Sequence, residues 1–95
     1  MPAYVIANVT IDDPVRYEDY KRMVPRTLTP FGGRFIVRGG NVEVLEGTWQ
    51  PERLVILEFP SVDRARAWWN SQEYAEARAL RQATSTGTLV ILEGV

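Results

Sequence analysis

Four polar side chains in the sequence are of the types that bind and activate small organic molecules. They are Asn8, Arg34, Arg38 and Glu58. Each falls in a segment that alternates like a β-strand, and regular strands would place all four on the face of the sheet away from the helices, in an otherwise apolar space between two sheets. An arginine there would bind an anionic or enolate oxygen, and Glu58 would act as the base. The alternative is an ion pair between Glu58 and an arginine, with no ligand.

A second set of candidates is aromatic and lies in the last third of the chain. Trp68 and Trp69 are adjacent in a predicted helix, so one packs on the sheet while its neighbour, about 100° around the helix, faces a cleft or solvent. We expect Trp69 to form an apolar wall of a ligand site. Tyr74 shares a helical stripe with Arg78 and Arg81 that would meet an anionic ligand. Core packing and a solvated charged face are the alternatives.

The composition limits the chemistry available to these residues. The 95 residues include no cysteine and no histidine, which excludes thiolate nucleophiles, Cys/His zinc sites and Ser-His or Cys-His arrangements. No acidic loop offers oxygen ligands to a metal, so we expect neither a metal nor a cofactor. A net charge of −1 disfavours nucleic acid as a partner. No apolar stretch approaches the ~18 residues of a membrane span, so we expect a cytoplasmic protein without membrane attachment.

The first elements that must position the candidate residues are a strand and a helix. Tyr4 to Ile11 is rich in β-branched residues and is typical of a strand. Asp13 followed by Pro14 predicts a helix start, because Asp is a good N-cap acceptor and proline suits the first helical position. Apolar residues recur at helical spacing as far as Leu28. Pro25 is expected to kink this helix or tighten its last turn.

The middle of the chain predicts two or three strands. Arg34 to Arg38 alternates like a strand, and Val42 to Glu46 resumes the pattern. Gly39-Gly40 between them marks either a bulge in one long strand or a hairpin turn. Residues Gly47 to Glu52 form a turn, and Leu54 to Phe59 is the clearest strand, with five apolar residues among six.

The remaining sequence predicts helical structure followed by a final strand. Ser61 is a suitable cap for a helix that carries the two tryptophans. Asn70-Ser71 is a second start signal, with Glu73 in a capping-box relation to Asn70. The pattern therefore indicates two short helices or one broken helix that ends near Thr84. Leu89 to Glu93 closes the chain as a strand.

The order strand, helix, strand, strand, helix, strand is that of an α+β ferredoxin-like unit (βαββαβ), which we expect to form one domain over residues 1–95 with a four-stranded antiparallel sheet. Two helices cover only one face of such a sheet. Alternation predicts that the residues under the helices are Val5, Ala7, Val9, Phe35, Val37, Val55, Leu57 and Phe59.

Three strands are nevertheless apolar on both faces, and exposed patches of that size are unusual in monomers. A second copy packed sheet to sheet is the simplest cover, so we expect a homodimer.

Several segments match a known family in order and spacing over nearly the whole chain. They are Asp13-Pro14 with Tyr17 and Tyr20, Gly32 to Gly40, Val44 to Gly47, Pro51 to Arg53, Glu58 to Pro60, Trp69 to Ser71 with Glu73-Tyr74, and Leu92 to Gly94. The chain thereby resembles the domain of unknown function 1330 family of the dimeric α/β-barrel superfamily. The resemblance implies a ferredoxin-like protomer and a sheet-to-sheet homodimer, and it supplies no established reaction. More distant members of the superfamily include cofactor-independent monooxygenases, lactone isomerases and haem-binding enzymes.

Two functions of different kinds remain open from the sequence. One is a small-molecule site between the sheet and the helices of each protomer, catalytic towards a small aromatic or lactone-like compound. The other is a non-enzymatic binding or interaction module in which the same charged residues hold the dimer together.

Overall fold

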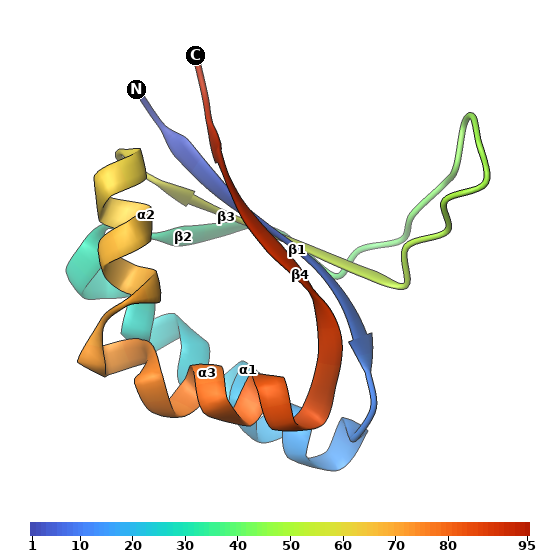
Figure 1. Ribbon diagram of the computed structural model, residues 1–95, viewed down its shortest axis with the longest axis horizontal. Helices are drawn as coiled ribbons and strands as arrows, with labels where there is room; N and C mark the ends of the chain where they lie inside the picture. The colour runs from blue at the N-terminus through green and yellow to red at the C-terminus, as the bar shows by residue number, and fades with distance from the viewer.

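Four strands and three helices make up the fold of a computed structural model that describes residues 1–95. In chain order they are β1 (Ala3–Ile11), α1 (Pro14–Leu28), a 3₁₀ turn (Thr29–Phe31), β2 (Arg34–Arg38), β3 (Arg53–Phe59), α2 (Val62–Trp69), α3 (Gln72–Thr84) and β4 (Ser85–Glu93). The strands form one antiparallel sheet in the order β2-β3-β1-β4, and the helices pack against one of its faces (Figure 1). The predicted α+β ferredoxin-like architecture is confirmed. None of the helices has the length and apolar character needed to cross a membrane.

Each helix begins at a side chain that accepts a hydrogen bond from the backbone of the first turn. Asp13 Oδ1 accepts from the Arg16 N–H at 3.2 Å, with Pro14 directly after it, as the sequence predicts. Ser61 caps α2, and the hydroxyl of Ser71 accepts from the Tyr74 N–H at 3.1 Å to start α3. Asn70 is the C-cap of α2 rather than a start signal. Two separate helices therefore follow β3.

The helix-covered face of the sheet forms the core. Val5, Ala7 and Val9 of β1 are 3%, 8% and 1% exposed, whereas the residues between them are half-buried. In β3, Leu57 and Phe59 are buried on the same side. The predicted faces of these two strands are confirmed, because both strands are regular.

The strand β2 contradicts its predicted faces because it contains a bulge. Phe35 pairs with Leu57 of β3, but the next paired residue is Val37, which lies opposite Ile56. One extra residue in a strand reverses the side to which all later residues point. Val37 therefore lies on the face away from the helices, and Arg38, opposite Val55, lies on the helix-covered face. The prediction had these two residues the other way round.

The segment 39–52 links β2 to β3 and contains no strand, so the strand predicted at Val42 to Glu46 is wrong. Every residue from 41 to 50 is exposed, and the segment projects away from the body of the protein (Figure 1). Alternation alone does not make a strand, since the backbone needs a neighbour to which it can bond. Gly39 opens this link with a φ of 71° and donates its N–H to the Leu54 carbonyl at 2.9 Å. Gly39-Gly40 is thus neither a bulge within a long strand nor a tight hairpin turn.

The last strand is longer than predicted. It begins at Ser85 and pairs with β1 from Ile11↔Ser85 to Ala3↔Glu93. Residues Thr86 to Thr88 are polar or glycine, so a prediction based on the pattern of apolar residues does not detect this part of the strand. The Thr86 hydroxyl donates to Asp12 Oδ2 at 2.8 Å, which fixes the start of the strand against the end of β1.

The face of the sheet away from the helices carries exposed apolar side chains. Leu92 and Val90 of β4 are 53% and 50% exposed, and Val37 of β2 is 37% exposed. Cross-strand pairing places Val37, Ile56, Ile6 and Val90 in one row across this face. We call it the open face.

Candidate functional site

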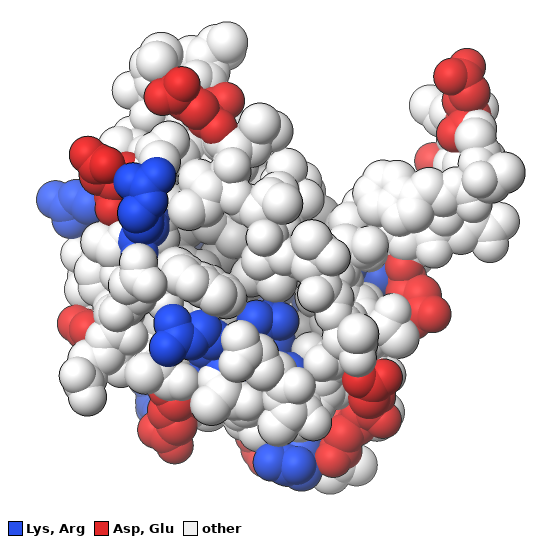
Figure 2. Space-filling model, in the orientation of Figure 1, with Lys and Arg blue, Asp and Glu red and all other residues white.

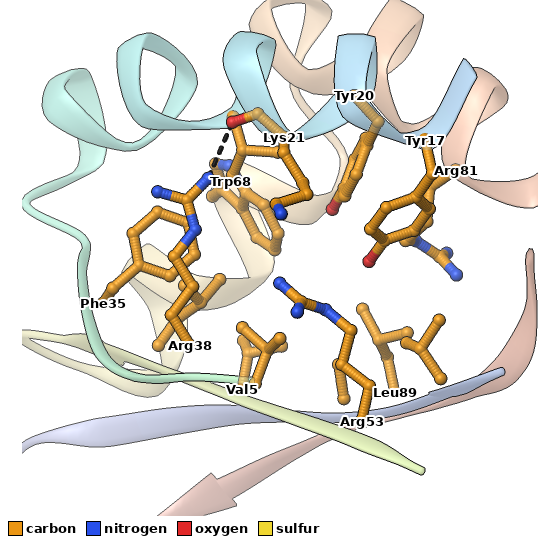
Figure 3. A pocket seen from close by; sticks show the side chains of 15 residues that line it. Val5, Tyr17, Tyr20, Lys21, Phe35, Arg38, Arg53, Trp68, Arg81 and Leu89 are labelled. Atoms are coloured by element: carbon orange, nitrogen blue, oxygen red, sulfur yellow. Dashed lines mark hydrogen bonds between the residues drawn. The ribbon is translucent and has the colours of Figure 1, made fainter. Parts of the chain in front are cut away.

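A narrow cavity lies between the helix-covered face of the sheet and the helices (Figure 3). Its volume of about 30 Å³ is room for roughly two water molecules. Most of the lining is apolar: Val5, Ala7, Val9, Val24, Phe35, Val55, Leu57, Trp68 and Leu89, with Tyr17 and Tyr20. This is the location, between sheet and helices, at which the sequence leads us to expect a small-molecule site.

Four cationic side chains complete the lining of this cavity, and no carboxylate does. They are Lys21, Arg38, Arg53 and Arg81. Figure 3 shows the guanidinium of Arg53 pointing from the start of β3 towards α1, where Lys21 and Tyr20 project towards it. The guanidinium of Arg38 lies 4.1 Å from the centre of the Phe35 ring, and its Nη2 donates to the Lys21 carbonyl at 2.7 Å. The cavity therefore combines apolar walls with a local excess of positive charge.

Arg53 and Arg81 have no anionic partner within the chain. Neither forms an ion pair, and the Nε atom of each is buried without a hydrogen-bond acceptor. Arg81 as a whole is only 6% exposed. The contacts of their guanidinium groups are with aromatic rings, Arg53 at 5.7 Å from the Tyr17 centroid and Arg81 at 5.9 Å from that of Trp69. Arg53 is half-buried. Buried polar groups are normally paired, so two arginines at one cavity whose buried Nε–H groups lack an acceptor are unusual.

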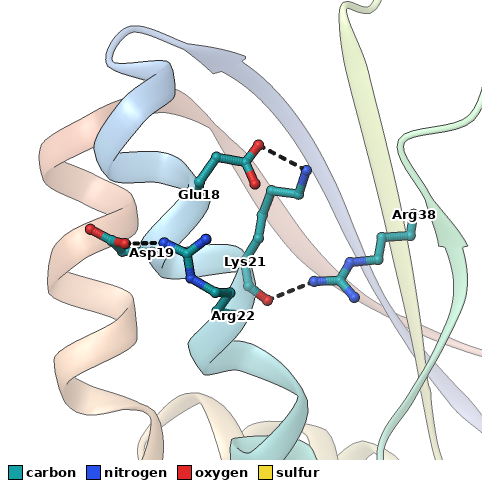
Figure 4. A network of polar contacts seen from close by, with 5 residues as sticks. All are labelled: Glu18, Asp19, Lys21, Arg22 and Arg38. Carbon is teal, nitrogen blue, oxygen red and sulfur yellow. Dashed lines mark hydrogen bonds and ion pairs between the residues drawn. The ribbon is translucent and has the colours of Figure 1, made fainter.

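The cavity adjoins a polar hollow on the side of α1 and β2. This hollow has a volume of about 520 Å³ and shares Lys21, Arg38 and Arg53 with the cavity. Carboxylates are present here, outside the cavity: Lys21 Nζ lies 3.2 Å from Glu18 Oε1, and Arg22 pairs with Asp19 (Figure 4). Lys21 and Arg22 are therefore compensated by carboxylates at this opening, whereas Arg38 and Arg53 are not.

An apolar hollow adjoins the cavity on the side of β4 and α2. Its volume is about 240 Å³, and all six lining residues are hydrophobic: Val5, Trp68, Trp69, Leu89, Val90 and Ile91. Three of them, Val5, Trp68 and Leu89, also line the cavity, so the two spaces are neighbours that share these walls. Trp68 is 1% exposed and packs in the core, whereas Trp69 is half-buried and forms a wall of the hollow, as predicted for two adjacent tryptophans.

The aromatic groups behind the cavity are held in place by buried hydrogen bonds. The Trp68 Nε1–H donates to the Thr27 hydroxyl at 3.0 Å, and this hydroxyl donates to the Val24 carbonyl at 2.7 Å. The hydroxyls of Tyr20 and Tyr74 lie 3.0 Å apart. Burial raises the pKa of Tyr20 far above its ordinary value, and the nearby Tyr74 raises it further. Tyr20 is therefore a neutral hydrogen-bonding group and not a base.

Of the four polar residues predicted on one face, Asn8, Arg34 and Glu58 lie on the open face, and only Arg38 does not. Glu58 lies on the open face, where its Oε1 accepts from Arg34 Nε at 2.9 Å and Nη2 at 2.7 Å. Asn8 is on the same face but pairs with Leu54, four residues along β3 from Glu58, or about 13 Å away along the strand. Arg38 is on the opposite face. Glu58 is consequently separated by the sheet from the cavity in which it was expected to act as a base.

The two aromatic candidates lie close together, but they have different surroundings. The rings of Trp69 and Tyr74 have centroids 6.0 Å apart. Tyr74 is fully buried and contacts Tyr20, whereas Trp69 borders the apolar hollow. Arg78 donates to the Trp69 carbonyl at 2.6 Å and lies over its ring. The expectation of a solvated arginine stripe on α3 is wrong for Arg81, which is buried at the cavity.

Sequence reasoning missed Lys21 and Arg53 among the residues that line the cavity. Arg53 lies one residue before the predicted start of its strand, at Leu54. Had the predicted strand begun one residue earlier, as β3 does, alternation with Val55 and Leu57 would have placed Arg53 under the helices. Lys21 carried no such signal, because it occurs among several charged residues of an amphipathic helix.

Residues 2–95 match the family model of the domain of unknown function DUF1330, and the chain belongs to this family. A protein of unknown function from Rhodopseudomonas palustris, RPA0582, has a similar structure with a TM-score of 0.79 at 21% identity, over 99% of this chain and 82% of that one. A dimeric ferredoxin-like protein of unknown function from Jannaschia sp. CCS1 gives 0.69 at 14% identity, over 99% and 100%. SnoaB, a cofactor-independent oxygenase from Streptomyces nogalater, gives 0.66 at 11% identity, over 99% and 93%. No curated protein matches the sequence. At these identities the solved structures establish the shared fold.

Proposed function

We propose that this protein is a homodimer that binds a small organic molecule in the cavity between the sheet and helices of each protomer. The observation that carries the proposal is that Arg53 and Arg81 each have a buried Nε–H without an acceptor at a cavity whose other walls are mostly apolar. A purely structural interior would have paired these charges or replaced them with apolar residues. Ligand sites in proteins commonly have this form, with mostly apolar walls and a few fixed polar groups.

The homodimer is supported by the open face. Its row of Val37, Ile56, Ile6 and Val90 is covered by no element of the same chain. A second copy would bury this row sheet to sheet, in the twofold arrangement that is commonest among oligomers. The similar protein from Jannaschia is described as dimeric, which agrees with this arrangement.

A cofactor-independent enzyme is the catalytic form of the same proposal, and SnoaB is described as such an oxygenase. The cavity offers cations to stabilise an enolate or carbanion, but its lining contains no Asp, Glu or His to act as the base. A substrate that binds already ionised fits this lining best. Such a carbanion would itself reduce oxygen, without a cofactor.

The alternative, an interaction module without a substrate, is favoured by one contact. The Arg34–Glu58 pair lies on the open face, where it would sit at the proposed interface. For these two residues a role in holding the dimer together is better supported than a role in the cavity. Glu58→Gln is therefore expected to weaken the dimer and to leave ligand binding unchanged.

Native mass spectrometry of freshly purified protein tests both parts of the proposal. We expect a dimer mass, with additional mass from a retained small molecule. Ile56→Lys places a charge in the middle of the open face and is expected to give a folded monomer, checked by circular dichroism. Val15→Lys, at a residue of α1 that is 80% exposed, is the matched control and should remain dimeric. A wild-type monomer at micromolar concentration would contradict the homodimer.

A further inference from the structure

We propose that the ligand is an apolar organic anion, whose negatively charged oxygens bind Arg53 and Arg81 while its apolar body occupies the hollow beside Trp69. The inference rests on the proposed function, since it names the class of molecule bound at the same site. It assigns a role to two arginines and to a hollow, none of which is needed to hold the fold together.

The charge of the ligand follows from the charges around the cavity. The lining holds four cations and no carboxylate, and Glu18, the acidic residue that lines the adjoining polar hollow, already pairs with Lys21. Arg81 is 94% buried, and its Nε–H has no acceptor, nor has that of Arg53. A carboxylate or enolate oxygen would accept these hydrogens in charge-assisted bonds, which are stronger than bonds to a neutral group. A neutral ligand would leave both guanidinium groups without a counter-charge.

The apolar part of the ligand follows from the shape of the space. The cavity itself has room for about two water molecules, which suits the oxygens of a carboxylate but not a ring. The neighbouring hollow beside Trp69 has about 240 Å³ and only hydrophobic lining residues, and the Arg81 guanidinium lies 5.9 Å from the Trp69 ring centroid. A cavity of about 150 Å³ accepts benzene, so the hollow has space for a ring of that size.

The surface around this hollow agrees with entry of an anion. Figure 2 shows basic side chains in the depression between the helices and the sheet, while the acidic side chains lie towards the periphery of this face. Arg78 is held over Trp69 at the same place, with its guanidinium 5.3 Å from the ring centroid. Positive charge at the entrance of a cleft attracts and orients an anion before it binds.

Benzoate and benzamide are the probes that test the inference, because they share a ring and differ in charge. Wild-type protein labelled with ¹⁵N is titrated with each, and the Nε–Hε signals of Arg53 and Arg81 and the indole signal of Trp69 are followed. Benzoate is expected to shift all three signals and to bind about tenfold or more tightly than benzamide. This measurement needs no variant, so it decides the question even where a substitution prevents folding.

Substitution then distinguishes a specific role of the two arginines from a general effect of positive charge on the protein. Arg53→Gln and Arg81→Gln should each weaken benzoate binding about tenfold and leave benzamide binding within about twofold of wild type. Arg64→Gln removes the same charge from an exposed position of α2 and is the control, with unchanged binding of both probes. Equal binding of benzoate and benzamide at the cavity would overturn the anion and keep the small-molecule site. If neither probe shifts the cavity signals at millimolar concentration, the site itself is wrong.

Discussion

The hydroxyl groups of Tyr20 and Tyr74 lie 3.0 Å apart in the core, and they join α1 to α3 across 54 positions of the sequence. Tyr74 is fully buried, and Tyr20 is 9% exposed. Each hydroxyl has the other as its partner, so each is satisfied only while the two helices keep their relative position. The pair also lies directly behind the cavity that Tyr20 lines, which makes it a support for the proposed site.

Tyr20→Phe is expected to lower the free energy of unfolding by about 1–3 kcal/mol, because it leaves the buried Tyr74 hydroxyl without a partner. Urea denaturation followed by circular dichroism measures this loss. The double variant Tyr20→Phe/Tyr74→Phe should lose less than the sum of the two single variants, since no unpaired hydroxyl remains. Tyr4→Phe, at a half-buried residue whose hydroxyl makes no hydrogen bond within the chain, is the control. Additive losses would show that the two hydroxyls do not interact.

Stability is expected to fall as the pH rises above about 10, through Tyr20. Burial holds the pKa of Tyr20 in the folded protein far above 10.0, so only the unfolded chain releases this proton near pH 10. The folded state then binds one proton more, and its stability decreases by about 1.4 kcal/mol per pH unit. Urea unfolding at pH 9, 10 and 11 measures the slope in wild type and in Tyr20→Phe. An identical slope in both proteins would show that Tyr20 is not responsible.

Thr27→Val is expected to destabilise the protein by about 1–3 kcal/mol, although it changes little in volume. The Thr27 hydroxyl accepts from the Trp68 indole, and valine would leave that buried N–H without an acceptor. Thr27→Ser keeps the hydroxyl and should retain most of the stability. Thermal unfolding monitored by tryptophan fluorescence compares the two variants. Equal melting temperatures would indicate that the hydrogen bond contributes nothing measurable.

Gly39→Ala is expected to be destabilising, by about 1 kcal/mol or more, whereas Gly40→Ala is not. Gly39 has a φ of 71°, which disfavours any side chain, and a Cβ there would collide with Nη1 of Arg53. A Cβ at Gly40 would meet no atom within 4 Å, and the φ of Gly40 is not positive, so this neighbouring glycine is a matched control. Denaturant midpoints give the comparison, and the Nε–Hε signal of Arg53 reports whether its guanidinium is displaced. Equal midpoints for both variants would contradict the close approach of Arg53 to Gly39.

The fold could be predicted from the sequence because its signals are local and mutually consistent. Asp13-Pro14 and Ser61 start helices through bonds within four residues, and the alternation of Val5, Ala7 and Val9 is undisturbed along β1. Each signal depends only on near neighbours in the chain. Where a segment depended on a distant partner, prediction failed: Val42 to Glu46 alternates, yet it has no strand beside it.

The site could be predicted only in part, and the reason lies in β2. A cavity between sheet and helices with a tryptophan wall was expected, and the assumption of regular strands placed Arg38 on the open face together with Asn8, Arg34 and Glu58. The bulge after Phe35 appears in the pairing with β3 and not in the residue types of β2. Whether a cation has a counter-charge is likewise a property of the assembled fold. The sequence placed Arg81 on a stripe that would meet an anionic ligand, but only the structure shows that Arg53 joins it at the cavity and that neither has an anionic partner.

The bulge has a consequence for reading related sequences. A relative could keep the residues Arg34 to Arg38 letter for letter and yet, if its second strand paired regularly without the bulge, turn its second arginine to the opposite face of the sheet. Identical letters at that alignment column would then describe a cavity group in one protein and an interface group in another. Equivalent arginines across these proteins are therefore to be matched by the residue opposite them on β3, such as Val55, rather than by their column.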